Sequence, residues 1–373
     1  MPRYILQLCH GYDAPFSDVA RQYASLFKDS DFKVITVFLT GKKQQKVIDE
    51  VASEQVIFLE NTSKDLRGLK RKQIRQLKAI ARNYKFEFVI AHRYKSVFIA
   101  CHLKAVNVIG VHHAFDDYKR LSRRFFAWRN KNKLFLLGVS NAIRDNLRHY
   151  LRYFPEQQIQ TLYNRIDLDA LQKQQLSRTQ SRKELFLEEN RYYYVNIGRL
   201  HPDKDQATLI KAFANVVKQQ ADAQLIIYGK GRLEQPLRQL VIELKLEEKV
   251  FISSKPHIAH YLKAFDCFVL SSDYEPFGMV LLEAMAAELP VISTQEGGAG
   301  EVVKDCGLLF KRGDTEQLVK HMLVIRNMDE QSLQNLKQKM QAHLKQEFTD
   351  SVVREKFRQL PFPFLKQVLN AAL

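Results

Sequence analysis

Four charged residues in the second half of the chain have the types and spacing of a site for an anionic ligand. Arg199 and Lys204 bracket a turn, NIGRLHPDKDQATLI, that leads into a helix from about Gln206. Arginine offers forked donors, lysine offers a point charge, and Gly198 allows close approach of the backbone, which together suit a diphosphate. The alternative is an ordinary turn with exposed basic residues.

The other two charged residues are glutamates in the segment SSDYEPFGMVLLEAMAAELPVIST. Pro276 and Gly278 favour a turn after Glu275, and Met279–Ala287 has helical composition, so Glu283 falls about one turn inside that helix. Eight residues of helix span about 12 Å, which excludes a close acid–base pair but matches the length of a nucleotide sugar. The alternative for Glu283 is a carboxylate on an amphipathic helix, although its apolar neighbours indicate a mostly buried helix, where a carboxylate needs a partner.

Two further turns are rich in glycine. IYGKGRLEQPL contains Gly229 and Gly231 but lacks the third glycine of a dinucleotide fingerprint, so it is weak evidence for NAD and fits a tight turn. STQEGGAGEVV places three glycines before Glu301, where the backbone could pass close to a bound sugar or phosphate. The alternative is a flexible loop before a helix.

The elements that position these turns are short β-branched or aromatic runs alternating with segments of helical period. The expected strands are Tyr4–Leu8, Lys33–Leu39, Gln55–Leu59, Phe86–Ala91, Val106–His112, Leu134–Val139, Tyr192–Ile197, Gln224–Tyr228, Lys249–Ile252, Cys267–Leu270 and Pro290–Ser293. The expected helices include Asp18–Lys28, Leu69–Lys85, Gln206–Gln219 and Glu234–Leu244. Such alternation predicts parallel sheets covered on both faces, with ligands bound beyond the carboxyl ends of the strands.

Two domains are expected from the length of 373 residues and the 46% hydrophobic content. The strand pattern restarts at Tyr192 after a polar, strand-free stretch, Gln172–Asn190, which is interpreted as a hinge region. The predicted domains are therefore residues 1–172 and 173–350. Only helices are expected after Asn327, and the last, about 351–373, is expected to pack back on the first domain.

Cysteine spacing and hydropathy indicate in which cellular compartment the protein is expected. Cys9, Cys101, Cys267 and Cys306 lie far apart without a CxxC pair, which argues against disulfides and zinc and favours a reducing cytoplasm. The N-terminus does not resemble a signal peptide, and the sequence has no apolar run of 18 residues. We therefore expect a cytoplasmic protein without a membrane span.

The net charge of +17 is concentrated in the first half, where residues 1–190 contain 34 basic and 19 acidic residues. This asymmetry suggests an anionic partner: a membrane surface, a phosphorylated acceptor or nucleic acid. The basic stretches are residues 64–85 and 118–133, and the second interleaves Phe125, Phe126 and Trp128 with cations, as in an interfacial membrane contact. The alternatives are a solvated surface and aromatic residues of the core.

Taken together, the turns resemble the donor half of glycosyltransferase family 4, the retaining family with the GT-B architecture. The matching segments are GRLHPDK (198–204), GKG (229–231), EPFGMVLLE (275–283), EGGAGE (296–301), VSNAIRDNL (139–147) and YNRID (163–167). They cover about residues 105 to 325. The resemblance implies the α/β class, with two Rossmann-like doubly wound domains facing a central cleft.

The resemblance also assigns roles to the candidate residues. It implies that Arg199 and Lys204 hold a diphosphate, Glu275 the sugar hydroxyls and Glu283 the ribose. The implied donor-binding set is completed by Gly198, Gly229, Gly231, Pro276, Phe277, Gly278 and Met279. No cofactor and no metal are expected, because cations and helix dipoles stabilise the leaving diphosphate. UDP-glucose is the expected donor.

The first half resembles the family less closely. Its opening has one glycine, Gly11, where relatives often have two, and Gly11 and Arg93 are the candidate acceptor-binding residues. At the strand end GVHHAFDDY, His112 or His113 is expected near the anomeric carbon, so that the candidate catalytic residues are these histidines and Glu275. The alternative is a histidine that caps the strand. YNRID also departs from the commoner Asn-Gly at Arg165.

The segments HRYKSVF (92–98) and HHAFDDY (112–118) look closest to bacterial enzymes that extend the lipopolysaccharide core. This similarity implies a phosphorylated glycolipid acceptor and peripheral binding at the cytoplasmic face of the inner membrane. A nucleic-acid-binding protein is the alternative from another class, but no helix-turn-helix, finger or RNP pattern supports it. A phosphorylase or epimerase on the same architecture is a third reading.

Overall fold

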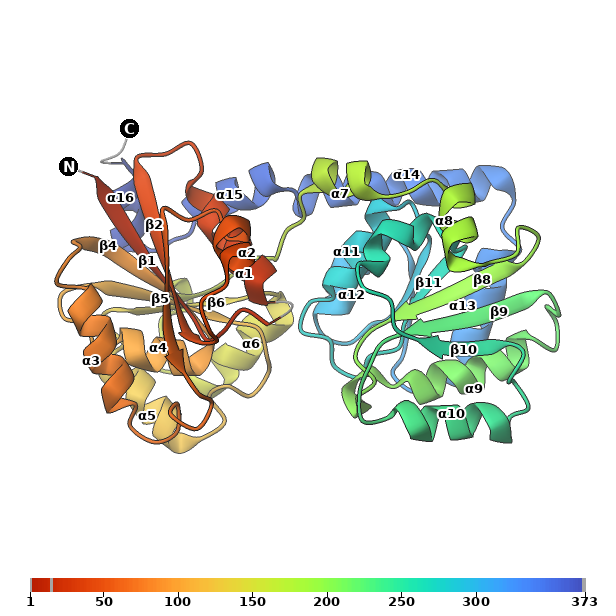
Figure 1. Cartoon of the computed structure of the whole chain (residues 1–373), viewed down its shortest axis with the longest axis horizontal. Coiled ribbons are helices and arrows are strands. Elements are labelled where there is room, and N and C mark those ends of the chain that lie inside the picture. Colours follow the sequence, from red (N-terminus) through yellow and green to blue (C-terminus); the bar gives the residue numbers. More distant parts are fainter. Residues whose placement is uncertain (1, 14–15, 371–373) are drawn as a thin grey trace. The chain divides into compact units, whose positions relative to one another are not determined.

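The computed structural model describes residues 2–13 and 16–370. The chain folds into two compact units: unit 1 is Met1–Asn164 with Val353–Leu373, and unit 2 is Arg165–Val352. The first division thus falls before the expected boundary at residues 172 and 173. Figure 1 shows the elements of each unit along the chain.

Unit 1 is built on a parallel sheet of seven strands in the order β3-β2-β1-β4-β5-β6-β7. Its strands are β1 (Arg3–Cys9), β2 (Phe32–Thr40), β3 (Gln55–Asn61), β4 (Phe86–His92), β5 (Asn107–His112), β6 (Leu134–Gly138) and β7 (Ile159–Thr161). The central strands are almost entirely buried, which explains their continuous apolar runs. The sequence did not predict β7, which is only three residues long.

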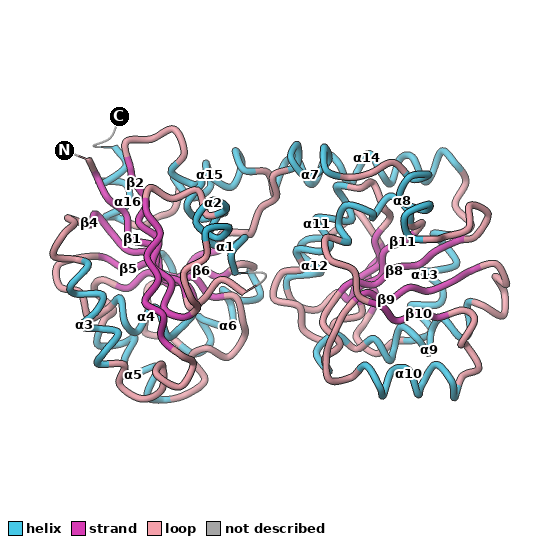
Figure 2. Tube along the Cα trace, viewed as in Figure 1, coloured by secondary structure: helices cyan, strands magenta, loops and turns pink. Residues whose placement is uncertain are grey.

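Helices lie around this sheet, as Figure 2 shows with helices in cyan and strands in magenta. They are α1 (Phe16–Ala24), α2 (Gln45–Glu50), α3 (Arg71–Ile80), α4 (Arg93–Ala100), α5 (Leu121–Arg129), α6 (Asn141–Tyr150) and α16 (Pro363–Asn370), with α15 (Asp350–Arg358) passing from unit 2 into unit 1. The C-terminal segment packs on this unit through aromatic rings: Phe357 lies 5.6 Å from Phe27, and Phe362 lies 4.9 Å from Phe135.

Unit 2 repeats the plan with six parallel strands in the order β10-β9-β8-β11-β12-β13. Its strands are β8 (Tyr192–Ile197), β9 (Ala223–Tyr228), β10 (Val250–Ser253), β11 (Cys267–Leu270), β12 (Val291–Thr294) and β13 (Leu308–Phe310). Its helices are α7 (Leu168–Gln174), α8 (Arg178–Leu185), α9 (Gln206–Val216), α10 (Glu234–Glu243), α11 (Met279–Ala286), α12 (Gly298–Val303), α13 (Thr315–Arg326) and α14 (Glu330–Glu347). The sequence did not predict β13.

The stretch Gln172–Asn190, interpreted from the sequence as a hinge, is part of unit 2. It contains no strand, as expected, but it does contain α8. Arg182 on α8 is fully buried, donates to the Ala264 carbonyl at 2.9 Å and pairs with Asp266 at 2.9 Å. A buried guanidinium with these partners ties the stretch to the core of unit 2, so the hinge interpretation is wrong for most of its length.

The α/β class with two doubly wound parallel sheets is confirmed. The strand order reverses between β1 and β4 in unit 1, and between β8 and β11 in unit 2. In open parallel sheets this reversal separates the two neighbouring loops and leaves a crevice at the carboxyl ends of the strands. The loops after β8 and β11 are those that carry the charged residues found in the sequence. No described helix is long and apolar enough to cross a membrane.

Candidate functional site

The turn after β8 presents its two cations differently. Arg199 has an exposed side chain and pairs with Asp203 at 3.3 Å, while Lys204 ends a short 3₁₀ turn, Pro202–Lys204, and is largely buried. Asp205 then caps α9 by accepting from the Thr208 amide. Because this cap fixes the start of α9 at Gln206, Arg199 and Lys204 both lie just before the N-terminus of the helix. The helix dipole favours an anion at this end.

The turn after β11 brings Glu275 to Lys204. The Lys204 ammonium forms an ion pair with Glu275 Oε2, and the Ser272 hydroxyl donates to the same oxygen at 3.1 Å. Glu275 is buried, and the Ser271 hydroxyl donates to the Lys204 carbonyl at 3.0 Å. The fold therefore joins the two predicted residues at the switch point of the second sheet.

The backbone of the loop EGGAGE (296–301) packs against the turn that contains Glu275. The Gly298 amide donates to the Glu275 carbonyl at 2.7 Å. A Cβ at Gly297 would lie 2.5 Å from the Glu275 carbonyl oxygen, and one at Gly298 would lie 2.2 Å from that of Pro276. Both glycines are thus required by backbone packing, and the loop leads directly into α12 at Gly298.

Gly229 and Gly231 have a similar structural role. A Cβ at Gly229 would lie 1.9 Å from the Gly198 carbonyl oxygen, and one at Gly231 would lie 2.3 Å from that of Leu200. These glycines let the turn after β9 pack against the turn that carries Arg199. Gly198 differs, because a Cβ there would meet nothing closer than the Lys204 side chain at 3.8 Å. Gly198 can therefore accommodate a Cβ without a clash, and it lines a cavity.

The remaining predicted donor residues lie at the start of α11. Gly278 has a left-handed backbone (φ 93°) that turns the chain into the helix, and Met279 is its first residue. Phe277 is buried and packs on Phe348 at 5.8 Å, so its side chain belongs to the core. Pro276 precedes it, and Glu283 lies one turn into the helix with a partly buried side chain.

A cavity of about 430 Å³ lies at the carboxyl ends of β8, β9 and β10. Its lining combines the predicted residues Gly198, Arg199 and Gly229 with residues that the sequence analysis missed. The latter are Ile197, Tyr228, Lys230, Ser254, Lys255, Pro256 and Ile258. Their position at the ends of expected strands, or within a few residues after them, was the only signal that could have identified them.

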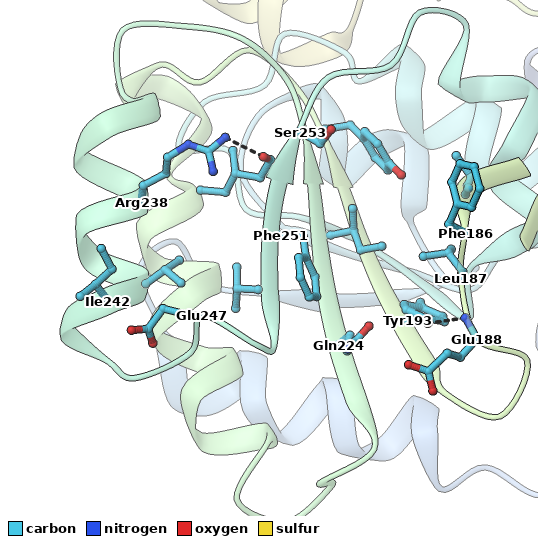
Figure 3. Close-up of a pocket in the computed structure, with 16 residues that line it drawn as sticks. Phe186, Leu187, Glu188, Tyr193, Gln224, Arg238, Ile242, Glu247, Phe251 and Ser253 are labelled. Atoms are coloured by element: carbon cyan, nitrogen blue, oxygen red, sulfur yellow. Dashed lines mark hydrogen bonds between the residues drawn. The ribbon is translucent and has the colours of Figure 1, made fainter.

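A larger cavity, about 670 Å³, contains none of the predicted residues. Figure 3 shows it over β9 and β10, with Phe251 and Phe186 among its apolar lining. Arg238 at its edge donates to the Ile252 carbonyl at 2.8 Å, and the Tyr193 hydroxyl accepts from the Glu188 amide at 2.9 Å. The cavity lacks the paired charges of the Lys204 turn.

In unit 1 the two candidate histidines have different environments. His112 ends β5 with a fully buried ring, and its Nδ1 lies 2.6 Å from Asp117 Oδ2. Its Nε2 faces the sheet, 3.4 Å from where a Cβ of Gly110 would be. His113 is partly exposed and contacts His92 Nδ1 through its Nε2 at 3.2 Å. Only His113 reaches the surface.

Gly11 and Arg93 flank the switch point of the first sheet. Gly11 follows β1, and a Cβ there would lie 2.8 Å from the Thr40 hydroxyl, so packing explains this glycine. Arg93 begins α4 with a left-handed backbone (φ 68°), and its guanidinium lies 4.9 Å from the centre of the Phe16 ring. His10, which the sequence analysis missed, lies beside them: burial, with the charges of Lys95 and Arg93, lowers its pKa to about 4.

Within the described residues, no group of three or more histidine, cysteine or acidic side chains is placed to hold a metal ion. All four cysteines are buried and unpaired. Arg165, in the segment that departs from Asn-Gly, is buried and pairs with Asp350 at 2.6 Å.

Two family models match the chain. Residues 177–343 match the family described as "Glycosyl transferases group 1", and residues 19–170 match "Glycosyltransferase Family 4". The second match covers most of the N-terminal part of unit 1, and the first covers most of unit 2.

Individual proteins agree with these matches. N-acetyl-alpha-D-glucosaminyl L-malate synthase of Bacillus anthracis is 33% identical over 209 residues, 53% of this chain and 54% of that protein, so the chain spans about half the length of this curated relative. HepE of Anabaena in complex with UDP superposes with a TM-score of 0.80 at 18% identity, covering 99% of this chain and 100% of that chain. The lipopolysaccharide outer core galactosyltransferase WaaB superposes with a TM-score of 0.71 at 16% identity, covering 96% and 98%. At such identities, the two structures show the fold.

Proposed function

The chain belongs to the family-4 type of glycosyltransferases with the GT-B fold, and we propose that it transfers a hexose from a nucleotide-diphosphate sugar to a sugar hydroxyl with retention of anomeric configuration. The ion pair between Lys204 and Glu275 at the switch point of unit 2 is the observation that carries the proposal. Each side chain holds the other until the donor supplies a phosphate for the lysine and hydroxyls for the carboxylate.

The donor extends along the turns of unit 2. The nucleoside occupies the cavity beside Gly198 and Arg199, where the backbone leaves room for close approach. Arg199 and Lys204 bind the diphosphate, with the first amides of α11 at Gly278 and Met279 adding positive dipole. Glu275 accepts from the hexose hydroxyls, and Glu283 binds the ribose. The UDP named in the HepE complex supports a uridine donor, and UDP-glucose is our first candidate.

In the reaction, the bond between the anomeric carbon and the diphosphate oxygen breaks, and its electron pair stays on the departing phosphate. Lys204, Arg199 and the α11 amides stabilise that charge, without a metal ion or a cofactor. The acceptor oxygen bonds to the same face of an oxocarbenium-like sugar and gives its proton to the departing phosphate. No side chain acts as nucleophile, because Glu275 is assigned to binding the hexose hydroxyls.

Unit 1 binds the acceptor. We assign the histidine near the reacting carbon to His113, because the ring of His112 is fully buried against Asp117. The acceptor is a phosphorylated glycolipid of the lipopolysaccharide core, and the protein binds the cytoplasmic face of the inner membrane peripherally. The support is the basic N-terminal half, the exposed face of α5 and the likeness to WaaB.

The test combines donor binding with matched variants. We expect one of the UDP-, GDP- and ADP-sugars to raise the melting temperature of the protein, since a ligand at 100 times its Kd stabilises the native state by about 2.7 kcal/mol. Lys204→Gln and Glu275→Gln should remain folded and lose about 100-fold or more in transfer rate. Lys211→Gln, an exposed lysine on α9, is the control and should transfer normally.

Two results would contradict the proposal: normal transfer by either site variant, or no stabilisation by any nucleotide sugar. A salt-dependent shift of DNA without nucleotide-sugar binding would instead favour a nucleic-acid-binding protein. Products formed with free phosphate, or without any acceptor, would identify a phosphorylase or an epimerase.

A further inference from the structure

Five basic side chains from three segments of unit 1 gather around the first turn of α4. Arg67 and Lys70 lie in the loop before α3, Arg93 and Lys95 begin α4, and Arg123 lies on α5. We call these five residues the cationic cluster. Arg67, Lys70 and Arg123 belong to the two basic stretches of the sequence, residues 64–85 and 118–133, and the fold brings them to Arg93 and Lys95 on α4.

Aromatic rings on α4 hold two members of the cluster against this helix. The Lys70 ammonium lies 4.8 Å from the centre of the Phe98 ring, and the Arg123 guanidinium lies 4.3 Å from that of Tyr94. The Phe98 ring in turn packs on Phe126 of α5 at 4.7 Å. Cation–π contacts of this kind restrain side chains that would otherwise spread into solvent.

The cations are close enough to perturb one another. Burial lowers the pKa of Lys95, and the charges of Arg93, Arg123 and Arg67 lower it further. Burial also lowers the pKa of Lys70, with contributions from Lys95 and Arg123. Like charges held together destabilise a fold unless an anion neutralises them.

The protein itself supplies little negative charge at this place. Asp117 faces the cluster, 3.6 Å from Arg123, but its other oxygen is bonded to His112. Within residues 2–13 and 16–370, no carboxylate lies within 4 Å of the basic groups of Arg67, Lys70, Arg93 or Lys95. The Lys70 ammonium donates instead to the Gly68 carbonyl. The cluster therefore carries an excess of positive charge over its carboxylate partners.

The backbone is also unusual at two of these residues. Lys70 (φ 53°) and Arg93 (φ 68°) both have left-handed conformations, which residues with a Cβ rarely adopt. They lie directly before α3 and at the start of α4, respectively. Strain of this kind persists where the surrounding structure holds a functional arrangement.

We propose that the cationic cluster binds a phosphate monoester of the acceptor. The cluster would thus be a recognition site in unit 1 separate from the place where the acceptor hydroxyl receives the sugar. That the phosphate belongs to an acceptor rests on the proposed function. Binding of a phosphate monoester by the cluster concerns unit 1 alone. A compact group of cations suits the concentrated charge of a monoester, whereas a nucleic acid would require a stripe of cations along its backbone.

The test measures binding of glucose 6-phosphate to the full chain by calorimetry, with glucose as the uncharged comparison. We expect the protein to bind the phosphate ester and not glucose. The double variant Lys70→Gln/Lys95→Gln should bind it about tenfold or more weakly, because each lysine contributes a charge-assisted hydrogen bond. Lys95→Arg should retain binding, since it keeps the charge.

Two controls separate this site from general charge and from the donor site. Lys28→Gln/Lys104→Gln removes the same charge from exposed positions of unit 1 and should bind glucose 6-phosphate normally. Lys204→Gln, in the donor site, should also bind it normally. Unchanged affinity in the Lys70/Lys95 variant, or loss of affinity in Lys204→Gln, would overturn the proposal.

A vesicle experiment distinguishes a phosphorylated acceptor from a lipid headgroup. If Lys70→Gln/Lys95→Gln lost binding to phosphatidylglycerol vesicles but kept its affinity for glucose 6-phosphate, the cluster would be a headgroup site and the proposal wrong. Nucleotide-sugar binding is measured in parallel and should be unchanged in this variant. Absence of such binding in the unmodified protein would refute the donor proposal while leaving the phosphate result standing.

Discussion

At the scale of single residues, burial holds three histidines of unit 1 neutral. His10, His92 and His113 lie at the carboxyl ends of β1, β4 and β5, in a region rich in arginine and lysine. Burial is the largest cause in each case: it lowers the pKa of His10 to about 4 and of His113 to about 3, and it lowers that of His92 well below 6.5. A neutral imidazole can exchange hydrogen bonds with a substrate without adding to the positive charge.

These shifts predict an acid-sensitive fold. In the unfolded chain these histidines bind protons below about pH 6.5. In the folded protein the pKa of His10 is about 4 and that of His113 about 3, and the pKa of His92 is also lowered. The unfolded state therefore binds more protons in this window, and the free energy of unfolding should fall as the pH is lowered from about 7 to 4. Urea unfolding at several pH values measures this. His113→Asn should show a smaller fall, and an identical pH dependence would contradict the assignment.

At the scale of elements, the glycines in the turns of unit 2 have different expected roles: Gly229 is needed for packing and Gly198 for ligand binding. Gly229→Ala would drive a Cβ into the Gly198 carbonyl, at 1.9 Å, and should cost about 1–3 kcal/mol in stability. Gly198→Ala has room for its Cβ and should leave the melting temperature unchanged while weakening donor binding. Thermal unfolding with and without nucleotide sugar tests both variants. Equal stability of the two variants would show that the packing argument is wrong.

The aromatic residues of α5 were predicted either to form an interfacial membrane contact or to belong to the core, and the structure places them on both sides of this amphipathic helix. Phe126 packs inward on Phe98, whereas Leu121, Phe125 and Trp128 are exposed by 75%, 59% and 47%. These three residues follow helical spacing and form one outward face, with arginines and lysines around it. An exposed apolar face bordered by cations fits the surface of an anionic bilayer.

The exposed face of α5 makes a direct prediction. Phe125→Ser/Trp128→Ser should weaken binding to phosphatidylglycerol vesicles about tenfold or more, because each aromatic side chain contributes about 1.5–3 kcal/mol when buried. Stability in solution should hardly change, since both rings already face water. Co-sedimentation measures the binding, with phosphatidylcholine vesicles as the uncharged comparison. Unaltered sedimentation would remove α5 from the membrane proposal.

At the scale of the whole molecule, the chain ends in the unit in which it began. Residues from Val353 onward belong to unit 1, where Phe362 is fully buried between Phe135 and Phe364. Phe362→Ala should lower the stability of unit 1 by about 3–5 kcal/mol. The shift in melting temperature caused by a nucleotide sugar should persist, because the donor residues lie in unit 2. Loss of that shift would show that the donor site depends on both units.

Strand positions could be read from the sequence because buried parallel strands are continuous apolar runs, and every expected strand was found. The strands β7 and β13 were missed because three residues are too few to form such a run. The hinge interpretation failed at Arg182, since a polar stretch is normally exposed and only the fold supplied the Asp266 carboxylate that allows its burial. Glu275 and Lys204 were identified by residue type, but their direct contact was not predicted.

By itself, the sequence determined which turns carry charge and glycine, and in what order, because these depend on local composition. Only the tertiary structure decided which side chains meet: that His112 points inward, that Gly229 and Gly297 pack against carbonyls, and that five cations from three segments gather at the first turn of α4. Such contacts join residues far apart along the chain. Their geometry follows from strand order and packing, which no local pattern contains.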